Sequence, residues 1–296
     1  MPRLPVILIF GASGRLGGSL RRAWADHFDI ICPTRSEADF DDPEGCAAAA
    51  RKFEFNVLVN CAAMTSPEVC EERPEPARKV NAMTPGTLAK LCQERAARMI
   101  HISTDYVFSG DGTEPLTEDS PTGPVNVYGK TKLEGENLVL SACPAALVAR
   151  VSWLFGGNMP SFPDMILAKA RAGQPLCAIG DKWGTPTSTV DLASWLTYLI
   201  TEHPTLGGLI HLCNSGAATW HEYAKGTVDA AYDLGLLPTK PVVEAQALDS
   251  FEAFRARRPR FTPMSAQRFA SRTNITPLPW QEALRQHLLR QMNANV

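Results

Sequence analysis

The chain has 296 residues, 45% of them hydrophobic, and a formal net charge of −2. This length is enough for one large domain or two of moderate size, and the nearly balanced charge excludes a broad electrostatic attraction to nucleic acid or to a membrane surface. No apolar run approaches the roughly 20 residues that span a bilayer, and no basic leader with a long apolar segment opens the chain, so we expect a cytoplasmic protein.

The first 150 residues alternate between short apolar strands and longer helical segments. We expect strands at residues 6–10, 29–32, 56–60, 99–103 and 146–151. We expect helices at residues 15–27, 44–52, 75–95 and 128–140, the third of them broken or kinked near Pro85. This alternation predicts an α/β fold with a doubly wound, Rossmann-like parallel sheet that helices cover on both faces.

After residue 151 the alternation is less regular. We expect helices at residues 165–172, 190–201, 220–234 and 281–292, a short strand at 209–213, and irregular chain at 241–263. No low-complexity linker separates the two halves, so we expect the second half to pack against the first.

A glycine-rich turn follows the first expected strand. The spacing there is GxxGxxG, and a turn of this kind also occurs without a ligand. Its position between the first strand and the first helix favours a dinucleotide site, because glycines let a phosphate approach the backbone and the helix N-terminus offers free amides. We predict cofactor contacts from Gly11, Ser13, Gly14, Arg15, Leu16 and Gly17.

The end of the second expected strand carries no acidic residue. A site that prefers NAD would place one there to bind the 2′-hydroxyl of the ribose, whereas this chain has Arg35. Arg35 predicts a contact with a 2′-phosphate and therefore NADPH, with NADH as the alternative cofactor and a solvated arginine as the alternative interpretation. Asp39 and Phe40 are expected to border the adenine.

Tyr128 and Lys132 are four residues apart and therefore lie on one face of the predicted helix. A free tyrosine has a pKa of about 10, and a nearby positive charge lowers it toward the working range. The hydroxyl of Thr104 can hold a carbonyl oxygen against the phenol. A Tyr-x-x-x-Lys pair arises often by chance, but together with Thr104 and the glycine turn it predicts catalytic proton transfer at a carbinol oxygen.

With these motifs, the chain resembles the extended short-chain dehydrogenases/reductases and, more narrowly, the dTDP-4-dehydrorhamnose reductase family. The matching stretches span almost the whole chain and lie at residues 103–108, 126–136, 150–156, 184–187, 191–193, 219–223 and 258–259. The tryptophan at position 153 and the Gly-Thr-Pro-Thr stretch from Gly184 are more specific to this family than the first two stretches.

The resemblance implies NADPH-dependent reduction of the C4 ketone of a dTDP-4-keto-6-deoxyhexose. We expect dTDP-4-dehydrorhamnose as the substrate and dTDP-L-rhamnose as the product. Tyr128 would donate the proton to the alkoxide, Lys132 would lower the pKa of the tyrosine and hold the nicotinamide ribose, and Thr104 would bind the carbonyl oxygen.

By family position, further residues would contact the two ligands. Ala62, Ala63 and Thr65 would line the cofactor, while Asp105, Tyr106 and Trp153 would contact the sugar. Arg258 belongs to a run of four arginines in six residues, which predicts a clamp for the diphosphate or, alternatively, a solvated basic segment.

The resemblance also implies a division of the chain. Residues 1–150 would form the dinucleotide-binding Rossmann domain, and residues 151–296 would form mainly a smaller C-terminal substrate-binding lobe. The segment at about 178–206 is expected to return to the Rossmann domain.

Two other functions use a similar scaffold. A nucleotide-sugar epimerase or dehydratase would keep NAD bound through turnover, and a regulatory subunit resembling methionine adenosyltransferase beta would bind a partner without catalysis. Intact Thr104, Tyr128 and Lys132 argue against the regulatory subunit, which needs none of them.

The assembly and metal content follow from a few residues. We expect a monomer or homodimer without a metal, because Arg15 stands where members with a magnesium-bridged dimer offer a glutamate. The eight cysteines form no CxxC pair and lack histidines at zinc spacing, so we expect reduced thiols. His101 is expected to be a packed strand residue.

Overall fold

The computed structural model describes residues 5–157, 159–251 and 253–294. Its centre is a parallel sheet of six strands in the order β10-β5-β4-β3-β1-β2. These strands are β1 (Val6–Phe10), β2 (Asp29–Ile31), β3 (Val57–Asn60), β4 (Arg98–Thr104), β5 (Leu147–Val151) and β10 (Gly208–His211). The expected doubly wound α/β fold is confirmed.

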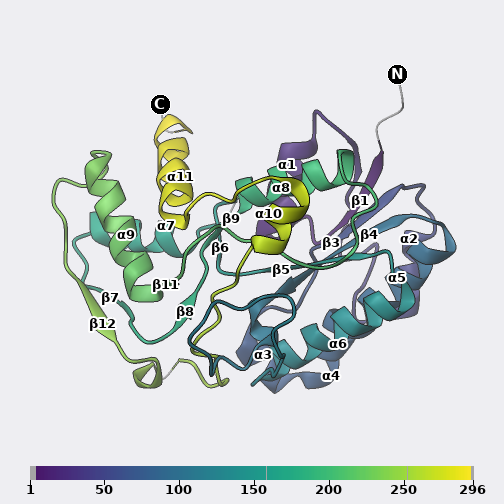
Figure 1. The fold of residues 1–296 in the computed structure, drawn as a ribbon, viewed down its shortest axis with the longest axis horizontal. Helices are drawn as coiled ribbons and strands as arrows, with labels where there is room; N and C mark the ends of the chain where they lie inside the picture. The colour runs from purple at the N-terminus through teal and green to yellow at the C-terminus, as the bar shows by residue number, and fades with distance from the viewer. Residues whose placement is uncertain (1–4, 158, 252, 295–296) are drawn as a thin grey trace.

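Helices cover both faces of this sheet, as Figure 1 shows. One face carries α1 (Arg15–Trp24), α8 (Thr189–Thr201) and α10 (Gln267–Thr273), and the other carries α2 (Pro43–Ala50), α5 (Thr84–Glu94) and α6 (Val127–Ala142). Alternate residues of β1 serve the two cores, with Ile7 and Ile9 in the first and Leu8 and Phe10 in the second. The strand is therefore apolar throughout, as a strand buried on both faces requires.

The helix expected at 75–95 is interrupted as predicted. It consists of α4 (Pro74–Arg78), a π-helical turn (Lys79–Met83) and α5, and the short helix α3 (Pro67–Glu72) precedes it. The Thr84 amide donates to the Lys79 carbonyl, five residues back. The π turn ends two residues before Pro85, which lacks the amide hydrogen that a regular α-helix would use.

A second core lies at the left of Figure 1 and forms the smaller lobe. Its main elements are α7 (Phe162–Arg171), β7 (Leu176–Ile179), α9 (Trp220–Asp233), β12 (Val243–Gln246) and α11 (Trp280–Ala294). Short strands connect this lobe to the sheet, namely β6 (Leu154–Phe155), β8 (Trp183–Gly184), β9 (Thr187–Ser188) and β11 (Ala218–Thr219).

The sequence prediction for the second half was incomplete. The expectation of irregular chain throughout 241–263 is wrong, because β12 pairs in parallel with β7 there. Three of the four residues of β12 are exposed, so the strand lacks the apolar alternation that would have indicated it. The strand β7 and the short helix α10 were also not predicted.

The expected division at residue 150 stays a prediction, but the structure shows which core each later element joins. The buried face of α8 shares a core with α1 and β1, and β10 is an edge strand of the central sheet. The first residues of the 178–206 segment instead belong to β7, which pairs with β12 in the smaller lobe.

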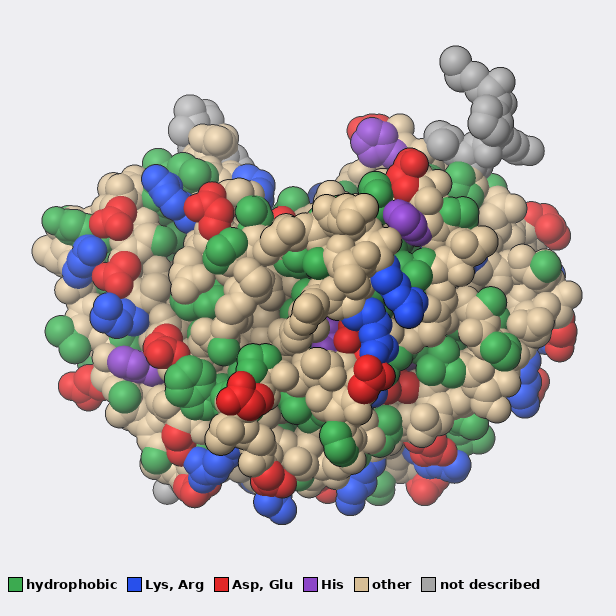
Figure 2. All heavy atoms as spheres, viewed as in Figure 1, with side chains coloured by type: hydrophobic (Ala, Val, Ile, Leu, Met, Phe, Trp, Pro, Cys, Tyr) green, Lys and Arg blue, Asp and Glu red, His purple; other side chains and the backbone are tan. Residues whose placement is uncertain are grey.

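The surface carries charges of both signs. Acidic and basic side chains are interspersed over the face that Figure 2 shows, and neither sign gathers there into a large patch. No helix within the described residues is long and apolar enough to cross a membrane.

Candidate active site

A cavity of about 550 Å³ lies over the carboxyl ends of three neighbouring strands. Its lining residues follow β1, β2 and β3, where the strand order changes direction, and this is the usual place for a ligand in an open α/β sheet. Of the predicted cofactor residues, those that line it are Gly11, Ser13, Gly14, Arg35, Phe40, Ala62 and Ala63.

The glycine turn is shaped for close approach of a ligand. Gly11 has a φ of +76°, and a Cβ at this position would collide with the backbone of Ala62. A Cβ on Gly17 would collide with the Gly11 carbonyl, so Gly17 lets α1 start directly against the turn. Gly14 caps α1 without a side-chain hydrogen bond, which leaves the first-turn amides to an anion.

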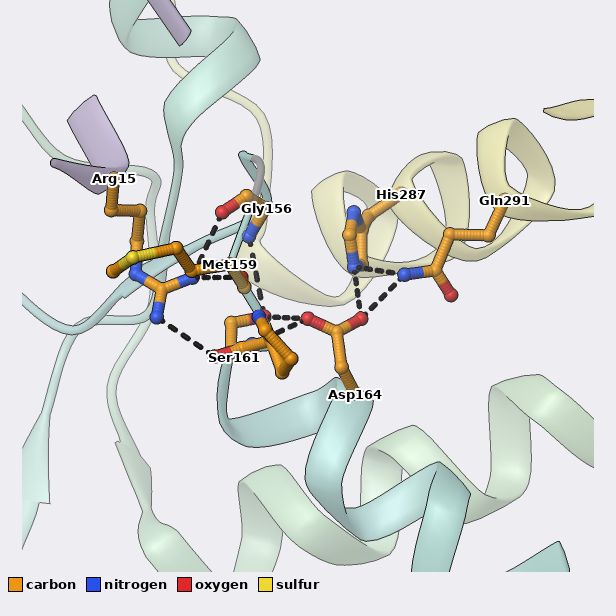
Figure 3. A network of polar contacts seen from close by, with 8 residues as sticks. Arg15, Gly156, Met159, Ser161, Asp164, His287 and Gln291 are labelled. Atoms are coloured by element: carbon orange, nitrogen blue, oxygen red, sulfur yellow. Dashed lines mark hydrogen bonds and ion pairs between the residues drawn. The ribbon is translucent and has the colours of Figure 1, made fainter. Parts of the chain in front are cut away.

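Arg15, Leu16 and Gly17 do not line the cavity. Leu16 is a core residue, and the side chain of Arg15 points toward the smaller lobe, as Figure 3 shows. The Arg15 guanidinium donates to the carbonyls of Gly156 (3.0 Å), Met159 (2.7 Å) and Pro160 (2.9 Å). If these three residues contact the cofactor, the contacts would therefore come from their main-chain amides.

The same region ties α7 to α11. The Asp164 carboxylate accepts hydrogen bonds from the Ser161 amide (2.6 Å) and from the His287 ring (2.9 Å), with Gln291 as a further donor (Figure 3). Burial alone would raise the pKa of Asp164, but these hydrogen bonds hold it below its ordinary value. The glycine turn and the smaller lobe are thus joined through one polar network.

Two arginines face the cavity beyond the second strand. Arg35 lines it as expected, and Arg21 of α1, which was not predicted, lines it as well. Arg21 follows Gly14 by seven residues and so lies on the same face of α1 two turns later, a spacing that could have indicated it. Asp39 and Thr65 are exposed and do not line the cavity.

The three predicted catalytic residues come from two adjacent elements. Thr104 ends β4, and Tyr128 and Lys132 lie on α6, all of them buried. Asn126 fixes the start of α6 by accepting a hydrogen bond from the Gly129 amide at 2.8 Å. None of the three predicted catalytic residues lines the cavity, but Met64 lines it and also packs against the cluster that contains Tyr128.

The electrostatics of Tyr128 differ from the expectation. Burial raises the pKa of the phenol, a hydrogen bond with the Thr104 side chain lowers it in part, and the Asp105 charge raises it further. Lys132 is not among the groups that shift this pKa, so the expectation that it acidifies the phenol is not confirmed.

The Lys132 amine is held elsewhere. Its Nζ donates to the Ile102 carbonyl at 2.6 Å and lies 3.3 Å from Nε2 of His101. The other ring nitrogen of His101 lies 3.1 Å from Nδ2 of Asn60. Burial lowers the pKa of Lys132 to about 8, and burial with the Lys132 charge keeps the pKa of His101 well below its ordinary value. His101 is a packed strand residue, as expected, and it also contacts the predicted catalytic lysine.

Asp105, Tyr106 and Trp153 lie around one buried group that the sequence did not indicate. The Lys182 ammonium is 5.1 Å from the centre of the Tyr106 ring and 5.9 Å from that of Trp153, and its charge acts on Asp105. The rings of Tyr106 and Tyr128 meet edge to face at 5.4 Å. Of the predicted sugar contacts, Tyr106 thus lies against the predicted catalytic Tyr128.

Trp153 has an unusual backbone, with a φ of +44°. Its indole lies so close to Gly184 that a Cβ there would collide with the ring. This contact explains why position 184, the first of the Gly-Thr-Pro-Thr stretch, is occupied by glycine.

Arg258 forms an ion pair across the two lobes. Its guanidinium donates to both carboxylate oxygens of Glu68, at 2.7 and 3.0 Å, and lies 3.6 Å above the Phe254 ring. Arg260 pairs with Asp181 and Asp249, and all four arginines line one cavity of about 420 Å³. A role for Arg258 in substrate binding stays a prediction.

The cysteines and possible metal ligands add no further site. All eight cysteines are free thiols. The described part of the chain contains no group of three or more histidine, cysteine, aspartate or glutamate side chains that could hold a metal ion.

Comparisons with known proteins agree with this geometry. The family model described as the RmlD substrate binding domain matches residues 5–293. The dTDP-4-dehydrorhamnose reductase of Salmonella typhimurium is 34% identical over 289 residues, which cover 95% of this chain and 96% of that protein. The enzyme of the same name from Mycolicibacterium smegmatis is 38% identical over 284 residues, covering 94% and 83%.

A solved structure adds the cofactor of a relative. The crystal structure of dTDP-4-dehydrorhamnose reductase from Bacillus anthracis in complex with NADP superposes with a TM-score of 0.89 at 26% identity, and the match covers 97% of this chain and 99% of that one.

Proposed function

We propose that this chain, which belongs to the RmlD substrate binding domain family, reduces the C4 ketone of a dTDP-4-keto-6-deoxyhexose with NADPH. The two relatives compared above are dTDP-4-dehydrorhamnose reductases. The proposed substrate is dTDP-4-dehydrorhamnose and the product dTDP-L-rhamnose. The observation that carries the proposal is the buried group of Thr104, Tyr128 and Lys132 beside the cavity at the carboxyl edge of the sheet.

The cavity fits a dinucleotide phosphate. Its glycine turn leaves no room for a Cβ at Gly11, and Gly14 leaves the first amides of α1 without a side-chain cap. Arg21 and Arg35 line the cavity as two cations. The turn and α1 amides would bind the diphosphate, and the two arginines would bind the 2′-phosphate. When bound, NADPH supplies the hydride.

The residues of this chain supply the proton and the orientation. Burial keeps the phenol of Tyr128 protonated at neutral pH, which is the state that reduction needs, because an alkoxide forms at the substrate oxygen. Tyr128 donates its proton to that oxygen, and the hydroxyl of Thr104 holds the oxygen in place. Lys132, whose amine is fixed by the Ile102 carbonyl, would hold the nicotinamide ribose of the cofactor.

A coupled assay tests the proposal. The 4-keto sugar nucleotide is generated in situ, NADPH or NADH is added in parallel, and the product is identified by NMR. We expect one equivalent of NADPH oxidised per sugar reduced, with the oxidised cofactor released into solution. Formation of an isomer without net cofactor oxidation would instead assign an epimerase, and no product from any 4-keto sugar would refute the proposal.

A further inference from the structure

Three buried side chains form a hydrogen-bonded chain that ends at the amine of Lys132. Asn60 ends β3 and lies opposite His101 of β4 in the register of the sheet. His101 follows Met99 by two residues, so its side chain points to the sheet face that α6 covers. The exposed fractions of Asn60 and His101 are 0%, and that of Lys132 is 1%. Because these polar groups are shielded from solvent, they need hydrogen-bond partners within the protein.

The backbone fixes the orientation of the Asn60 amide. Its Oδ1 accepts a hydrogen bond from the Ala62 amide at 3.0 Å, so its Nδ2 is the atom that faces Nδ1 of His101 at 3.1 Å. An amide nitrogen can only donate, and Nδ1 is therefore the acceptor. The ring is neutral, because burial keeps the pKa of His101 well below its ordinary value. Its single hydrogen is therefore on Nε2.

This tautomer places a donor in front of the lysine. Nε2 of His101 lies 3.3 Å from Nζ of Lys132, and Nζ also donates to the Ile102 carbonyl at 2.6 Å. An ammonium has three hydrogens and no lone pair, so it cannot accept from Nε2–H, whereas the neutral amine can. The opposite tautomer would accept from an ammonium but would set Nδ1–H against the Asn60 amide. Only the neutral amine leaves no donor facing another donor.

The other titratable groups near the amine do not replace this hydrogen bond. Burial, the largest effect, lowers the pKa of Lys132 to about 8, while Glu136 of α6 and Cys61 after β3 raise it. Glu136 is itself paired with Arg150 of β5 at 2.6 Å. The phenol of Tyr128, one turn earlier on α6, is uncharged at neutral pH because burial raises its pKa. The hydrogen bond from the histidine acts in the same direction as burial.

We propose that Asn60 and His101 are positioning residues of Lys132, in which Asn60 holds the His101 ring with its hydrogen on Nε2 and this hydrogen favours the uncharged amine. The chain begins at Ala62, which lines the cavity, and it ends at the amine that would hold the nicotinamide ribose. Asn60 and His101 act on the reaction through the lysine. This effect on catalysis rests on the proposed function, whereas the hydrogen-bonded chain does not.

Nitrogen-15 NMR of the histidines tests the tautomer without substrate or cofactor. The chemical shifts of the two ring nitrogens distinguish Nε2–H from Nδ1–H. The His101 signals are those that are absent from His101→Phe or, if that variant does not fold, from His101→Asn. We expect the wild-type ring to carry its hydrogen on Nε2 and to stay neutral down to about pH 5. A hydrogen on Nδ1 would overturn the proposal.

Asn60→Asp reverses the chain with almost no change in shape. A carboxylate accepts both from the Ala62 amide and from Nδ1–H, so the ring hydrogen moves to Nδ1 and Nε2 accepts from the lysine ammonium. The titration of Lys132 is followed by NMR of lysine labelled with carbon-13 at Cε, its signal being the one absent from Lys132→Met. We expect the midpoint to rise by about one pH unit or more. A midpoint at or below the wild-type value would contradict the proposal.

The added charge of the aspartate also raises the midpoint, so the same change is made without the ring. In His101→Phe combined with Asn60→Asp, we expect a smaller rise, relative to His101→Phe alone, than the ring gives when present. An equal rise would show that the carboxylate acts by charge alone and would overturn the role of the ring. Asn293→Asp adds a charge at an exposed position of α11 and should leave the midpoint unchanged.

Kinetics connect the chain to the reaction. An ammonium donates three hydrogen bonds and a neutral amine only two, so the basic limb of kcat/KM for NADPH should follow the Lys132 midpoint. In Asn60→Asp we expect this limb to move to higher pH by the same amount as the midpoint. A limb that stays in place while the midpoint moves would overturn the effect on catalysis. A wild-type protein that is inactive on every 4-keto sugar would refute the proposed function, and the NMR titrations would still decide the hydrogen-bonded chain.

Discussion

At the scale of single residues, the phenol of Tyr128 carries the proposed chemistry. It is buried and its pKa is raised, so it stores a proton at neutral pH. The expected acidification by Lys132 assumed that a shared helix face brings the two polar ends together. The structure shows instead that the lysine reaches back to the Ile102 carbonyl on β4, a contact that helix spacing does not indicate.

Tyr128→Phe removes the proton donor and little else. We expect turnover to fall by about 100-fold or more, while NADPH binding, measured by fluorescence titration, changes by less than about threefold. The matched control is Tyr232→Phe on the exposed face of α9, which should leave turnover intact. Wild-type turnover in Tyr128→Phe would remove the tyrosine from the mechanism.

Arg35 decides the proposed preference for NADPH. Arg35→Ala loses a charge-assisted hydrogen bond to the 2′-phosphate, so kcat/KM for NADPH should fall by about 10-fold or more, with little change for NADH. Arg22→Ala on α1, an exposed arginine that does not line the cavity, is the control. Equal effects on the two cofactors would place Arg35 outside the 2′-phosphate site, and Arg21 would then be tested in the same way.

At the scale of elements, the sequence predicted helices and strands correctly where the local pattern was strong. The apolar β1 followed by a glycine turn predicted the start of the fold, and Pro85 predicted the interruption that the π turn confirms. The strands β7 and β12 were not predicted, because they are short and pair only with each other. Their stability comes from contacts between distant segments, which local patterns do not report.

Asp164 joins α7 to α11 through hydrogen bonds with His287 and Gln291. Its folded-state pKa is lowered, so its contribution to stability is fully present above about pH 4 and is lost as the pH falls through the folded-state pKa. We expect Asp164→Asn to reduce the free energy of unfolding by about 1 to 2 kcal/mol at pH 7, and the difference from wild type to shrink in acid.

Urea unfolding at a series of pH values checks this expectation. Asp233→Asn, which changes a carboxylate that is 64% exposed, should cost less than about 0.5 kcal/mol at every pH. A difference between wild type and Asp164→Asn that stays constant from pH 7 down to pH 3 would contradict the proposed role of the charge.

At the scale of the whole molecule, the sequence predicted the family, the fold and the enzyme class, and these predictions are confirmed. It predicted less of the environment of the site. Lys182 and Glu68 were missed, because each is bound by a residue of a loop that lies far away in the chain. Local sequence patterns do not indicate such contacts. The predicted contact of Arg258 with the substrate stays a prediction, and its ion pair with Glu68 could not be read from the sequence.

The two lobes meet at the proposed site. Arg15 joins the glycine turn to Gly156, Met159 and Pro160, and Arg258 joins the C-terminal segment to α3. In the proposed function, a dinucleotide over the central sheet and a sugar nucleotide beside Tyr106 would meet near Tyr128, which is the arrangement that direct hydride transfer to the sugar requires.

The most direct test of this account follows the hydrogen itself. NADPH carrying deuterium at both C4 positions of its nicotinamide is supplied with the 4-keto sugar nucleotide, and the product is examined by NMR and mass spectrometry. The account predicts one deuterium at C4 of the sugar in the wild-type product, together with one equivalent of released NADP. A product without deuterium at that carbon, formed while the cofactor stays unoxidised, would contradict it.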